Sequence, residues 1–440
     1  MKMKKLLGAA CLLFLGLNMV NAQTTDSLYQ TNAISLITNG MGTHAPGGNF
    51  WGYAFGDYAY MGHGDSAGRG TKEQYKGLGA ASQTANPNAF ELRRAYLGYD
   101  YTINDKFSAN ALLAYEGDYD ANGNRTVFLK YLYFKWKNIF KGSDLKIGQQ
   151  ATNSFANAYN TEPLMGYRSS EKTLLDMHGV DGSADMGLGL EGKIVQFVHP
   201  TSTSFIGYSV MVRDYSGNAP VPGFAPTSGL NLNSTSDKDK KFSGNVYFNT
   251  LGNKLTIGAY MDYINYGNVP YKTLGTEFQS AVQTMKGYAT YNSKSFGIGA
   301  EFFTQTMKNG ETEVFKAGTG TNDTTDAGQM GFSVFAHVAL MQNSLSLFAR
   351  YDMYTPDTKY SYNANETFTS RMTNVSGSGN GNSYKETFIN AGLDWTPTDD
   401  KKVHIMPNIW YYGIKNGYGS GDLASDNYMV YRLTFLFAFR

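Results

Sequence analysis

Cysteine, long apolar runs and charge are all scarce in this sequence. The single cysteine among 440 residues, Cys11, lies in an N-terminal segment that resembles a cleaved leader, so the remaining chain forms no disulfide and has no thiol chemistry. After that segment no run of 18 or more apolar residues occurs, which excludes ordinary membrane-spanning helices. Charged residues make up 17%, against about 25% in a typical soluble protein. Part of the surface is therefore expected to avoid water.

Aromatic residues and glycine are plentiful, whereas proline is not. The chain has 33 Tyr, 27 Phe and 50 Gly but only 11 Pro. Aromatic side chains suit the pleated surface of a sheet, and glycine suits turns and crowded positions. A length of 440 residues allows two or three soluble domains or one large closed sheet. The composition favours a β-rich protein.

The first 22 residues have the pattern of a secretory signal peptide. Lys2, Lys4 and Lys5 precede an apolar run at 6–17, and Ala22 ends a small-residue cleavage site. The alternative, a membrane anchor, would need about 20 apolar residues. Removing three lysines changes the formal charge from +1 to −2, so no basic field indicates a nucleic-acid partner. We expect cleavage after Ala22, a periplasmic segment at 23–48 and a folded unit at 49–440.

Segments of about ten residues with alternating hydrophobicity recur along the chain. Clear examples are KLTIGAYMDY (254–263), QMGFSVFAHVALM (329–341) and the final MVYRLTFLFAFR (429–440). In each segment one parity is apolar and the other is small or polar, which is typical of strands with one face against an apolar environment.

The connections between these segments alternate in length. Brief turns are expected near 104–105, 142–143, 200–203, 252–253, 292–293, 342–343 and 398–400, and longer polar segments at about 61–89, 117–125, 151–185, 215–240, 266–284, 307–328, 355–385 and 414–427. Seven turns and eight loops make fifteen connections and hence sixteen strands. A soluble sandwich would also alternate apolar and polar residues, but it would not sort its connections in this way. The pattern predicts an all-β protein: a transmembrane antiparallel β-barrel of about 16 strands, with short periplasmic turns and long external loops.

Closure of such a barrel requires the last strand to pair with the first. No strand edge can be left unpaired in lipid. We therefore expect 429–440 to pair with NFWGYAFGDYAY at 49–60.

Charged residues inside the strands predict which parity faces the lumen. Arg350 and Asp352 alternate with Leu345, Leu347, Ala349, Tyr351 and Met353, and an outward arginine at the bilayer midplane would cost about 2 to 4 kcal/mol. By the same reasoning Arg94 and Asp100 face inward. In TVFLKYLYFKWKNI (126–139) both parities are apolar, so the orientation stays open; Lys135 and Lys137 are expected to mark its interfacial end.

The long connection 151–185 is the best candidate for narrowing the lumen. Its SSEKTLLDMH stretch suggests a short helix, with Ser169 or Ser170 at the start and Gly179 beyond the end. The candidate constriction residues are Arg168, Glu171, Lys172, Asp176 and Asp181. The alternative is a solvent-exposed external loop with an incidental helix.

FELRRAYLGYDYTINDKFSANALLAYEG (90–117) together with DMGLGLEGKI (185–194) resembles the phosphate-selective porin family of Gram-negative outer membranes. The resemblance implies a sixteen-stranded channel, commonly trimeric, in which the long loop after the fifth strand folds inward. Members that select phosphate line the pore with many arginines and lysines. This chain has ten arginines in all, so a general diffusion pore for small hydrophilic solutes or ions is expected instead.

Other motifs are weak. DYDANGN (118–124) begins like a calcium loop, but its twelfth position is Leu129 instead of Glu. The histidines lack zinc-ligand spacing, and Gly377, Gly379 and Gly381 lack the strand-turn-helix context of a phosphate loop. No metal or cofactor is expected.

Two further functions compete with a porin. One is a non-conducting barrel whose loops bind a surface or envelope partner. The other is an outer-membrane hydrolase, which is not favoured because His337 and His404 are expected to face inward without an identifiable catalytic partner. Lipid, small solutes or ions, and two further copies of the chain are the expected partners.

Overall fold

The computed structural model describes residues 46–64, 88–119, 124–154, 172–199, 202–214, 240–271, 276–315, 323–341, 344–356, 358, 366–370, 384–416 and 426–439. The expected signal peptide, most of the segment 23–48, two constriction candidates (Arg168 and Glu171), the glycine-rich stretch near 379 and residues 120–123 of the calcium-like turn lie outside these ranges.

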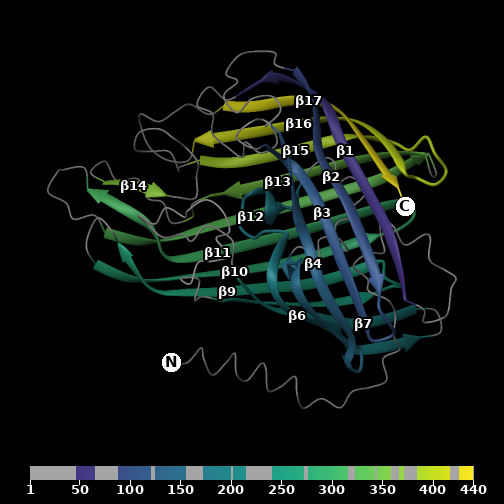
Figure 1. Cartoon of the computed structure of the whole chain (residues 1–440). Coiled ribbons are helices and arrows are strands. Elements are labelled where there is room, and N and C mark those ends of the chain that lie inside the picture. The colour runs from purple at the N-terminus through teal and green to yellow at the C-terminus, as the bar shows by residue number, and fades with distance from the viewer. Residues whose placement is uncertain are drawn as a thin grey trace.

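Seventeen strands are present in the described residues (Figure 1). The first nine are β1 (Gly47–His63), β2 (Asn88–Thr102), β3 (Phe107–Tyr119), β4 (Arg125–Phe140), β5 (Ser143–Ala151), β6 (Ala184–His199), β7 (Ser202–Asp214), β8 (Lys240–Thr250) and β9 (Leu255–Tyr271). The others are β10 (Thr276–Asn292), β11 (Phe296–Phe315), β12 (Asp323–Met341), β13 (Leu345–Thr355), β14 (Glu366–Ser370), β15 (Tyr384–Trp395), β16 (Val403–Asn416) and β17 (Asp426–Phe439).

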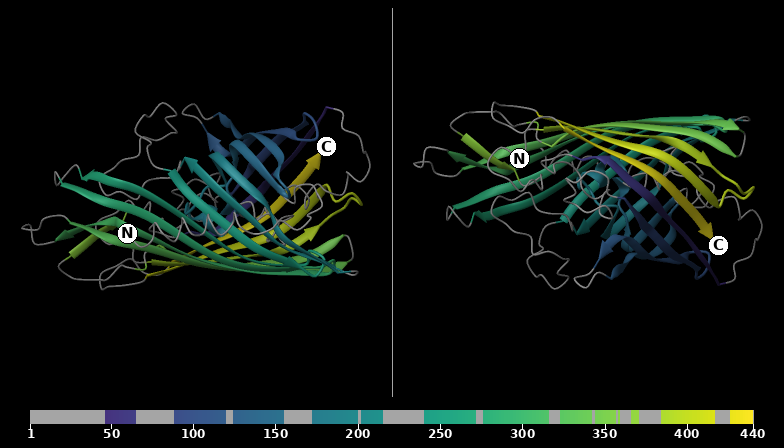
Figure 2. Two further views of the ribbon diagram at one scale, coloured as in Figure 1. Left: turned by 90° about the horizontal axis from the view of Figure 1, so that it is seen from below. Right: turned by 90° about the horizontal axis from the view of Figure 1, so that it is seen from above.

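Sixteen of these strands form one closed antiparallel wall, which confirms the predicted fold. Each strand pairs with its neighbour in sequence, except that β13 pairs directly with β15, and β17 pairs back to β1. The register at the closing seam runs from Gly52 opposite Phe439 to Met61 opposite Val430. In Figure 2 the final yellow strand lies beside the purple first strand. The remaining strand, β14, pairs only with the C-terminal end of β11, at 311–315, and is not part of the wall.

The outer face of the wall is apolar. The outward side chains of β17 from Tyr431 to Phe439 are more than two-fifths exposed, among them Leu433 at 47% and Phe435 at 41%. Equivalent positions on other strands are also exposed, including Leu97, Leu113, Val210, Ile257, Met285, Ile298, Phe302, Leu347 and Ile409. A soluble monomer seldom exposes an apolar patch larger than a few hundred Å². Apolar surface on every side of a closed barrel is suited to lipid.

Two loop lengths differ from the prediction. The segments 266–284 and 307–328 were expected to be loops, but β9 continues to Tyr271, β10 begins at Thr276, β11 continues to Phe315 and β12 begins at Asp323. These polar residues pair across their hairpins, because polarity alone does not prevent strand pairing beyond the apolar band. The four strands reach past the rest of the wall at the left of Figure 1, where β14 joins them.

Two bulges turn extra basic residues into the lumen. Phe55 pairs with Arg94 and Gly56 pairs with Leu92, so Arg93 is the inserted residue and shares the inner face with Arg94. Leu112 pairs with Tyr131 and Leu113 with Leu129, so Lys130 is inserted in the same way. Leu129, Leu132, Phe134 and Trp136 then face outward, which settles the orientation of β4.

Lys135, which with Lys137 was expected to mark the interfacial end of β4, faces the lumen; its position relative to the membrane interface stays a prediction. Its Nζ lies inside the barrel, 2.9 Å from Asp144 Oδ2 and 3.5 Å from Glu191 Oε1. Its carboxylate partners come from β5 and β6, so an expectation based on β4 alone could not include them.

Candidate functional site

The connection between β5 and β6 carries a helical turn, α4 (Leu174–Met177). Its N-cap is Thr173, whose hydroxyl accepts a hydrogen bond from the Asp176 backbone N–H at 3.4 Å. The helix therefore begins after the predicted Ser169 or Ser170. Gly179 follows its end with φ +65°, a conformation that favours glycine. None of the helices in the described ranges is long and apolar enough to cross a membrane.

One face of α4 packs on the inner wall of β11 and β13. Leu174, Leu175 and Val180 form a buried cluster with Phe303 of β11 and Tyr354 of β13. Leu174 and Phe303 are completely inaccessible to water. Burying a leucine side chain stabilises a structure by about 1.5 to 3 kcal/mol, so this contact holds the turn against the wall.

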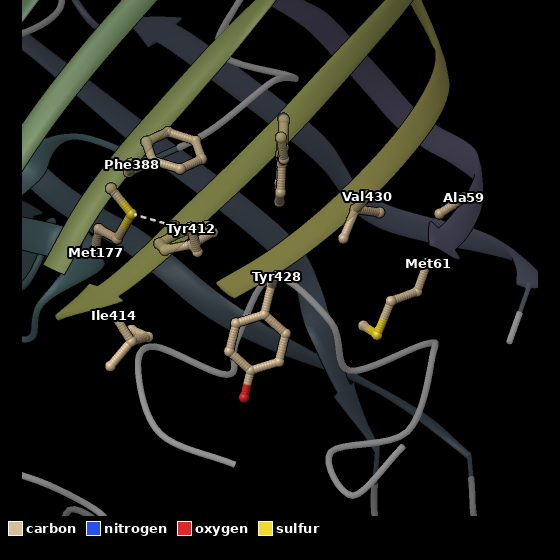
Figure 3. Packing of buried hydrophobic residues seen from close by; sticks show 9 residues of the cluster. Ala59, Met61, Met177, Phe388, Tyr412, Ile414, Tyr428 and Val430 are labelled. Carbon is tan, nitrogen blue, oxygen red and sulfur yellow. Dashed lines mark hydrogen bonds between the residues drawn. The ribbon is translucent and has the colours of Figure 1, made fainter. Parts of the chain in front are cut away.

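Met177 extends the contact to β15 and β16. Its sulfur lies 2.9 Å from the Tyr412 hydroxyl, which donates to it, and Phe388 belongs to the same buried cluster (Figure 3). Trp410 is a further member of that cluster. The Tyr412 and Phe388 rings lie 4.5 Å apart. Side chains of β11, β13, β15 and β16 therefore contact this one turn, and Leu174 also lies close to Gly331 of β12.

Polar groups reinforce the same contact. Arg350 Nη1 of β13 donates to the Lys172 carbonyl oxygen at 2.5 Å, while its Nε and Nη2 donate to Asp352. The His178 ring stacks on Tyr354 with centroids 3.6 Å apart. Burial, with a smaller contribution from the positive charge of Arg350, lowers the pKa of His178 to about 3. His178 is therefore neutral at pH 7.

The C-terminal part of the connection is fastened to a different region of the wall. Asp181 accepts from Arg213 Nη2 of β7 at 2.7 Å and from Lys241 Nζ of β8 at 3.0 Å. Ser154 donates to the same carboxylate. Burial alone would raise the pKa of Asp181, but Arg213 and Lys241 outweigh it and hold this pKa well below its usual range.

The first residues of the connection bind beside that anchor. Asn153 Nδ2 donates to the Ser209 carbonyl at 3.3 Å, and Ser243 Oγ donates to Asn153 Oδ1 at 2.7 Å. Asn245 Nδ2 donates to the Asn153 carbonyl oxygen at 3.2 Å. Both ends of the connection are thus held by β7 and β8.

These contacts place the described residues of the connection, 151–154 and 172–185, on opposite sides of the barrel. In the sixteen-stranded wall β13 is eight steps from β5, the strand from which the connection departs, and is therefore on the opposite side. The described part of 151–185 contacts inward-facing side chains of both sides. An external loop would leave those contacts unmade.

The sequence-based candidates occupy different positions in this arrangement. Asp181 is buried in the anchor, whereas Lys172, just before α4, and Asp176, within α4, are half-buried. Of the wall candidates, Arg350 and Asp352 form an ion pair next to α4, with Nη2 and Oδ2 2.8 Å apart. Arg94 and Asp100 face inward on β2.

Sequence reasoning missed Arg213 and Lys241, the two cations that hold Asp181. Both are almost fully buried and face inward. The inward orientation of both could have been predicted from the sequence, because Arg213 follows the outward-facing Val210 and Val212 and Lys241 precedes the outward-facing Phe242. Their pairing with Asp181 could not, because the paired residues are 32 and 60 positions apart in the sequence.

A second buried charge cluster lies at the closing seam of the barrel. Asp57 of β1 is fully buried; it accepts from Arg432 Nε of β17 at 2.9 Å, and Arg93 Nε lies 3.4 Å from it. Both guanidinium groups lie over the Trp410 ring, at 4.7 Å for Arg93 and 4.1 Å for Arg432. The cluster ties β1, β2, β16 and β17 together.

His404 was expected to lack an identifiable catalytic partner, and the structure differs from this expectation. Its Nδ1 lies 2.9 Å from Asp394 Oδ1, so it has an acidic partner. Its Nε2 lies 3.0 Å from the Lys401 carbonyl oxygen. In a catalytic triad this nitrogen would instead contact the hydroxyl of a serine nucleophile. Within the described ranges no group of three or more His, Cys, Asp or Glu side chains is arranged to hold a metal.

Known structures share this barrel architecture. The outer-membrane channel DcaP of Acinetobacter baumannii aligns over 90% of this chain and 98% of its own, with TM-score 0.53 and 12% identity. The anion-selective porin from Comamonas acidovorans aligns over 90% and 100%, with TM-score 0.51 and 13% identity. These likenesses concern the fold. No protein-family model and no curated protein matches the sequence.

Proposed function

We propose that this protein is a porin of the Gram-negative outer membrane. Small hydrophilic solutes or ions diffuse passively through its lumen, which the connection 151–185 narrows. The supporting observation is that this connection contacts both sides of a closed barrel whose outer face is apolar. The protein performs no chemistry and needs no cofactor in this proposal. The DcaP and Comamonas structures support the fold of a channel, and phosphate preference is not proposed.

The charges beside α4 define the proposed constriction. The candidates are the half-buried Lys172 and Asp176, and Arg350, which donates to the Lys172 carbonyl oxygen; Arg168 and Glu171 of the same connection are further candidates. Asp181 anchors the connection in this proposal instead of lining the pore, because Arg213 and Lys241 bury it. Opposite charges across a narrow aqueous passage orient polar solutes and disfavour apolar ones.

The decisive measurement is conductance. Purified protein in a planar bilayer is expected to give stepwise ion currents. Reversal potentials in a salt gradient should shift toward cation selectivity in Lys172→Glu. The matched control is Lys294→Glu on an exposed short turn, where selectivity should stay at the wild-type value. Ion currents whose reversal potential is the same in Lys172→Glu as in the wild type would overturn the assigned constriction.

One observation favours the second candidate, a barrel that does not conduct and uses its loops to bind a partner. Inward-facing side chains near the middle of several strands, including Asp57, Ser280, Thr284, Ser333 and Thr434, have no surface accessible to water. An open channel would wet its wall. Absence of current in repeated preparations of correctly folded protein would select this candidate.

Assembly and export complete the proposal. We expect a homotrimer in lipid, delivered by the signal peptide at 1–22. Mass spectrometry of the membrane-extracted protein should give a chain that starts at Gln23, and chemical cross-linking in detergent should yield a trimer band. A chain that retains its first 22 residues, or a monomer under these conditions, would contradict this part.

A further inference from the structure

We infer that the end of the barrel with the short turns binds the headgroup of an anionic phospholipid at Lys106, Lys137 and Lys141, called here the basic corner. The ligand class is a phosphodiester with a net negative charge, as in phosphatidylglycerol. The inference rests on the proposed function in one respect, that a lipid bilayer surrounds the barrel. It adds a class of lipid and the place where that lipid binds.

The backbone brings the three lysines to one corner of the barrel. Lys106 is the last residue of the turn between β2 and β3, and its carbonyl oxygen accepts from the Lys137 N–H of β4 at 2.7 Å. Lys141 is the first residue of the next short turn, between β4 and β5. Two neighbouring turns and the end of the strand between them therefore carry three ammonium groups.

The lysines of the basic corner are available to a ligand. Lys106 and Lys141 are exposed, and Lys137 is half-buried. Among the described residues no acid forms an ion pair with any of the three. Asp144, which is close to Lys141 in the sequence, pairs instead with Lys135 inside the barrel at 2.9 Å. The positive charge of the corner is thus not neutralised by the inner wall.

Aromatic rings lie directly beside these cations. Phe107 follows the first lysine, Trp136 precedes the second and Phe140 precedes the third. Trp136 is 39% exposed and Phe140 is 47% exposed on the outer face. The Phe107 and Trp136 ring centroids lie 5.6 Å apart. Such rings favour the boundary between acyl chains and headgroups, and a lysine there reaches the polar layer with its ammonium group.

This arrangement fits a lipid better than a soluble acidic partner. An anionic phospholipid has apolar chains and a phosphate a short distance apart, and the corner has outward rings and ammonium groups in the same order along the strands. A soluble acidic polypeptide would use the lysines but would gain nothing from rings that face the bilayer.

The turn between β15 and β16 provides a comparison at the same end of the barrel. Asp399 and Asp400 offset Lys401 and Lys402 there, so this turn has no net charge. The turns 103–106 and 141–142 of the basic corner contain one acid, Asp105. Each lysine near an anionic surface strengthens the attraction about fivefold. Anionic lipid should therefore be enriched at the basic corner and not at the turn 396–402.

Fluorescence quenching by brominated lipid in nanodiscs tests the inference. Trp136 lies beside the basic corner, and Trp395, 48% exposed, lies beside the neutral turn. Trp395→Phe reports the first site and Trp136→Phe the second, while Trp51 and Trp410, which have inward parity, give the same background in both. The ratio of quenching by brominated phosphatidylglycerol to quenching by brominated phosphatidylcholine should be severalfold higher at Trp136 than at Trp395.

Matched double variants test the lysines themselves. Lys106→Gln with Lys141→Gln should weaken phosphatidylglycerol binding about 25-fold, at about fivefold for each lysine, and lower the Trp136 ratio to that of Trp395. Lys401→Gln with Lys402→Gln removes the same charge from the same end and should leave the Trp136 ratio unchanged. Lys106→Arg with Lys141→Arg keeps the charge and should retain the preference. Heat-modifiable mobility on gels shows that each variant is folded.

Every other outcome counts against the inference. Equal ratios at the two tryptophans would overturn it, and so would the same ratio in both glutamine double variants. Displacement of brominated phosphatidylglycerol by soluble polyglutamate would indicate an acidic protein partner and overturn the assignment to lipid. Stepwise ion currents with equal ratios would overturn the inference and leave the porin proposal standing. A lipid preference without currents would support the inference and overturn the porin proposal.

Discussion

Strands β11 to β13 and strands β1 to β4 belong to the same wall but differ in the regularity with which their side chains alternate between the two faces. From Phe296 to Met307, β11 pairs with β12 without a register shift, and every second residue faces the lumen. β1 to β4 contain the bulges at Arg93 and Lys130, which bring two consecutive residues to the inner face. Strict alternation gives at most one inward side chain in two. A bulge exceeds that limit, so cations are concentrated beside Asp57 and Glu116.

Deletion of single residues should have the largest effect and tests the difference between the regular and the bulged strands. Without Arg93, Leu92 would face outward, Arg94 inward and Ala95 outward, so β2 would become regular and the barrel should fold. Without Ser333, half of β12 would turn its polar residues toward lipid, because a one-residue slip reverses every side chain. Heat-modifiable mobility on gels, a property of folded barrels, measures both variants. We expect no folded product for the deletion of Ser333.

A folded Ser333 deletion, or an unfolded Arg93 deletion, would contradict this account. Deletion of Lys130 provides a second case at a bulge. It should fold as well, although Glu116 would lose the ion pair that Lys130 makes with it.

The regular part of the wall could be predicted from sequence, and the bulged part could not. The orientation of Arg350 and Asp352 follows from five apolar neighbours of the opposite parity. Arg93 has the parity of the outer face, and its inward position depends on a mismatch with β1 that β2 alone does not reveal. That the connection 151–185 narrows the lumen stays a prediction, and its anchor could not be predicted because it required side chains from β7 and β8.

Substitution of a buried acid at the seam should have the next largest effect. Asp57→Leu removes the carboxylate that Arg432 and Arg93 share and leaves Arg432 only the longer contact to Glu91, at 3.3 Å. Breaking a buried ion pair in this way costs about 3 to 5 kcal/mol. Unfolding by urea in lipid vesicles measures the loss. Asp399→Asn, on an exposed turn, is the control. The double variant Asp57→Leu with Arg432→Leu should be more stable than Asp57→Leu alone; lower stability would disprove the charge argument.

An arginine on the outer face should cost less. Ala349 lies in the middle of the outward parity of β13, and Ala349→Arg should lower the free energy of unfolding by about 2 to 4 kcal/mol in lipid. Phe296→Arg, at the first residue of β11, lies near the short turns and should cost about 0 to 1 kcal/mol. Equal losses at the two sites, measured in the same vesicles, would argue against a membrane band centred on the middle of the strands.

The smallest effect concerns pH and separates the two contacts of the connection 151–185. The pKa of His178 is about 3 with α4 docked and about 6.5 when the imidazole is free, so proton binding favours release of α4. Docking is at full strength above pH 6.5 and weakens as the pH falls toward 3, by at most about 2 kcal/mol at pH 5. The depressed pKa of Asp181 keeps that carboxylate ionised at pH 5, so the anchor to Arg213 and Lys241 should persist.

Hydrogen exchange measured at pH 8 and pH 5, and corrected for the intrinsic rate, should be faster at pH 5 for residues 174–180 and unchanged for residues 152–154. His178→Phe should remove the pH dependence and keep the stacking on Tyr354, and equal loosening of both segments would mean that the anchor, and not His178, responds to acid.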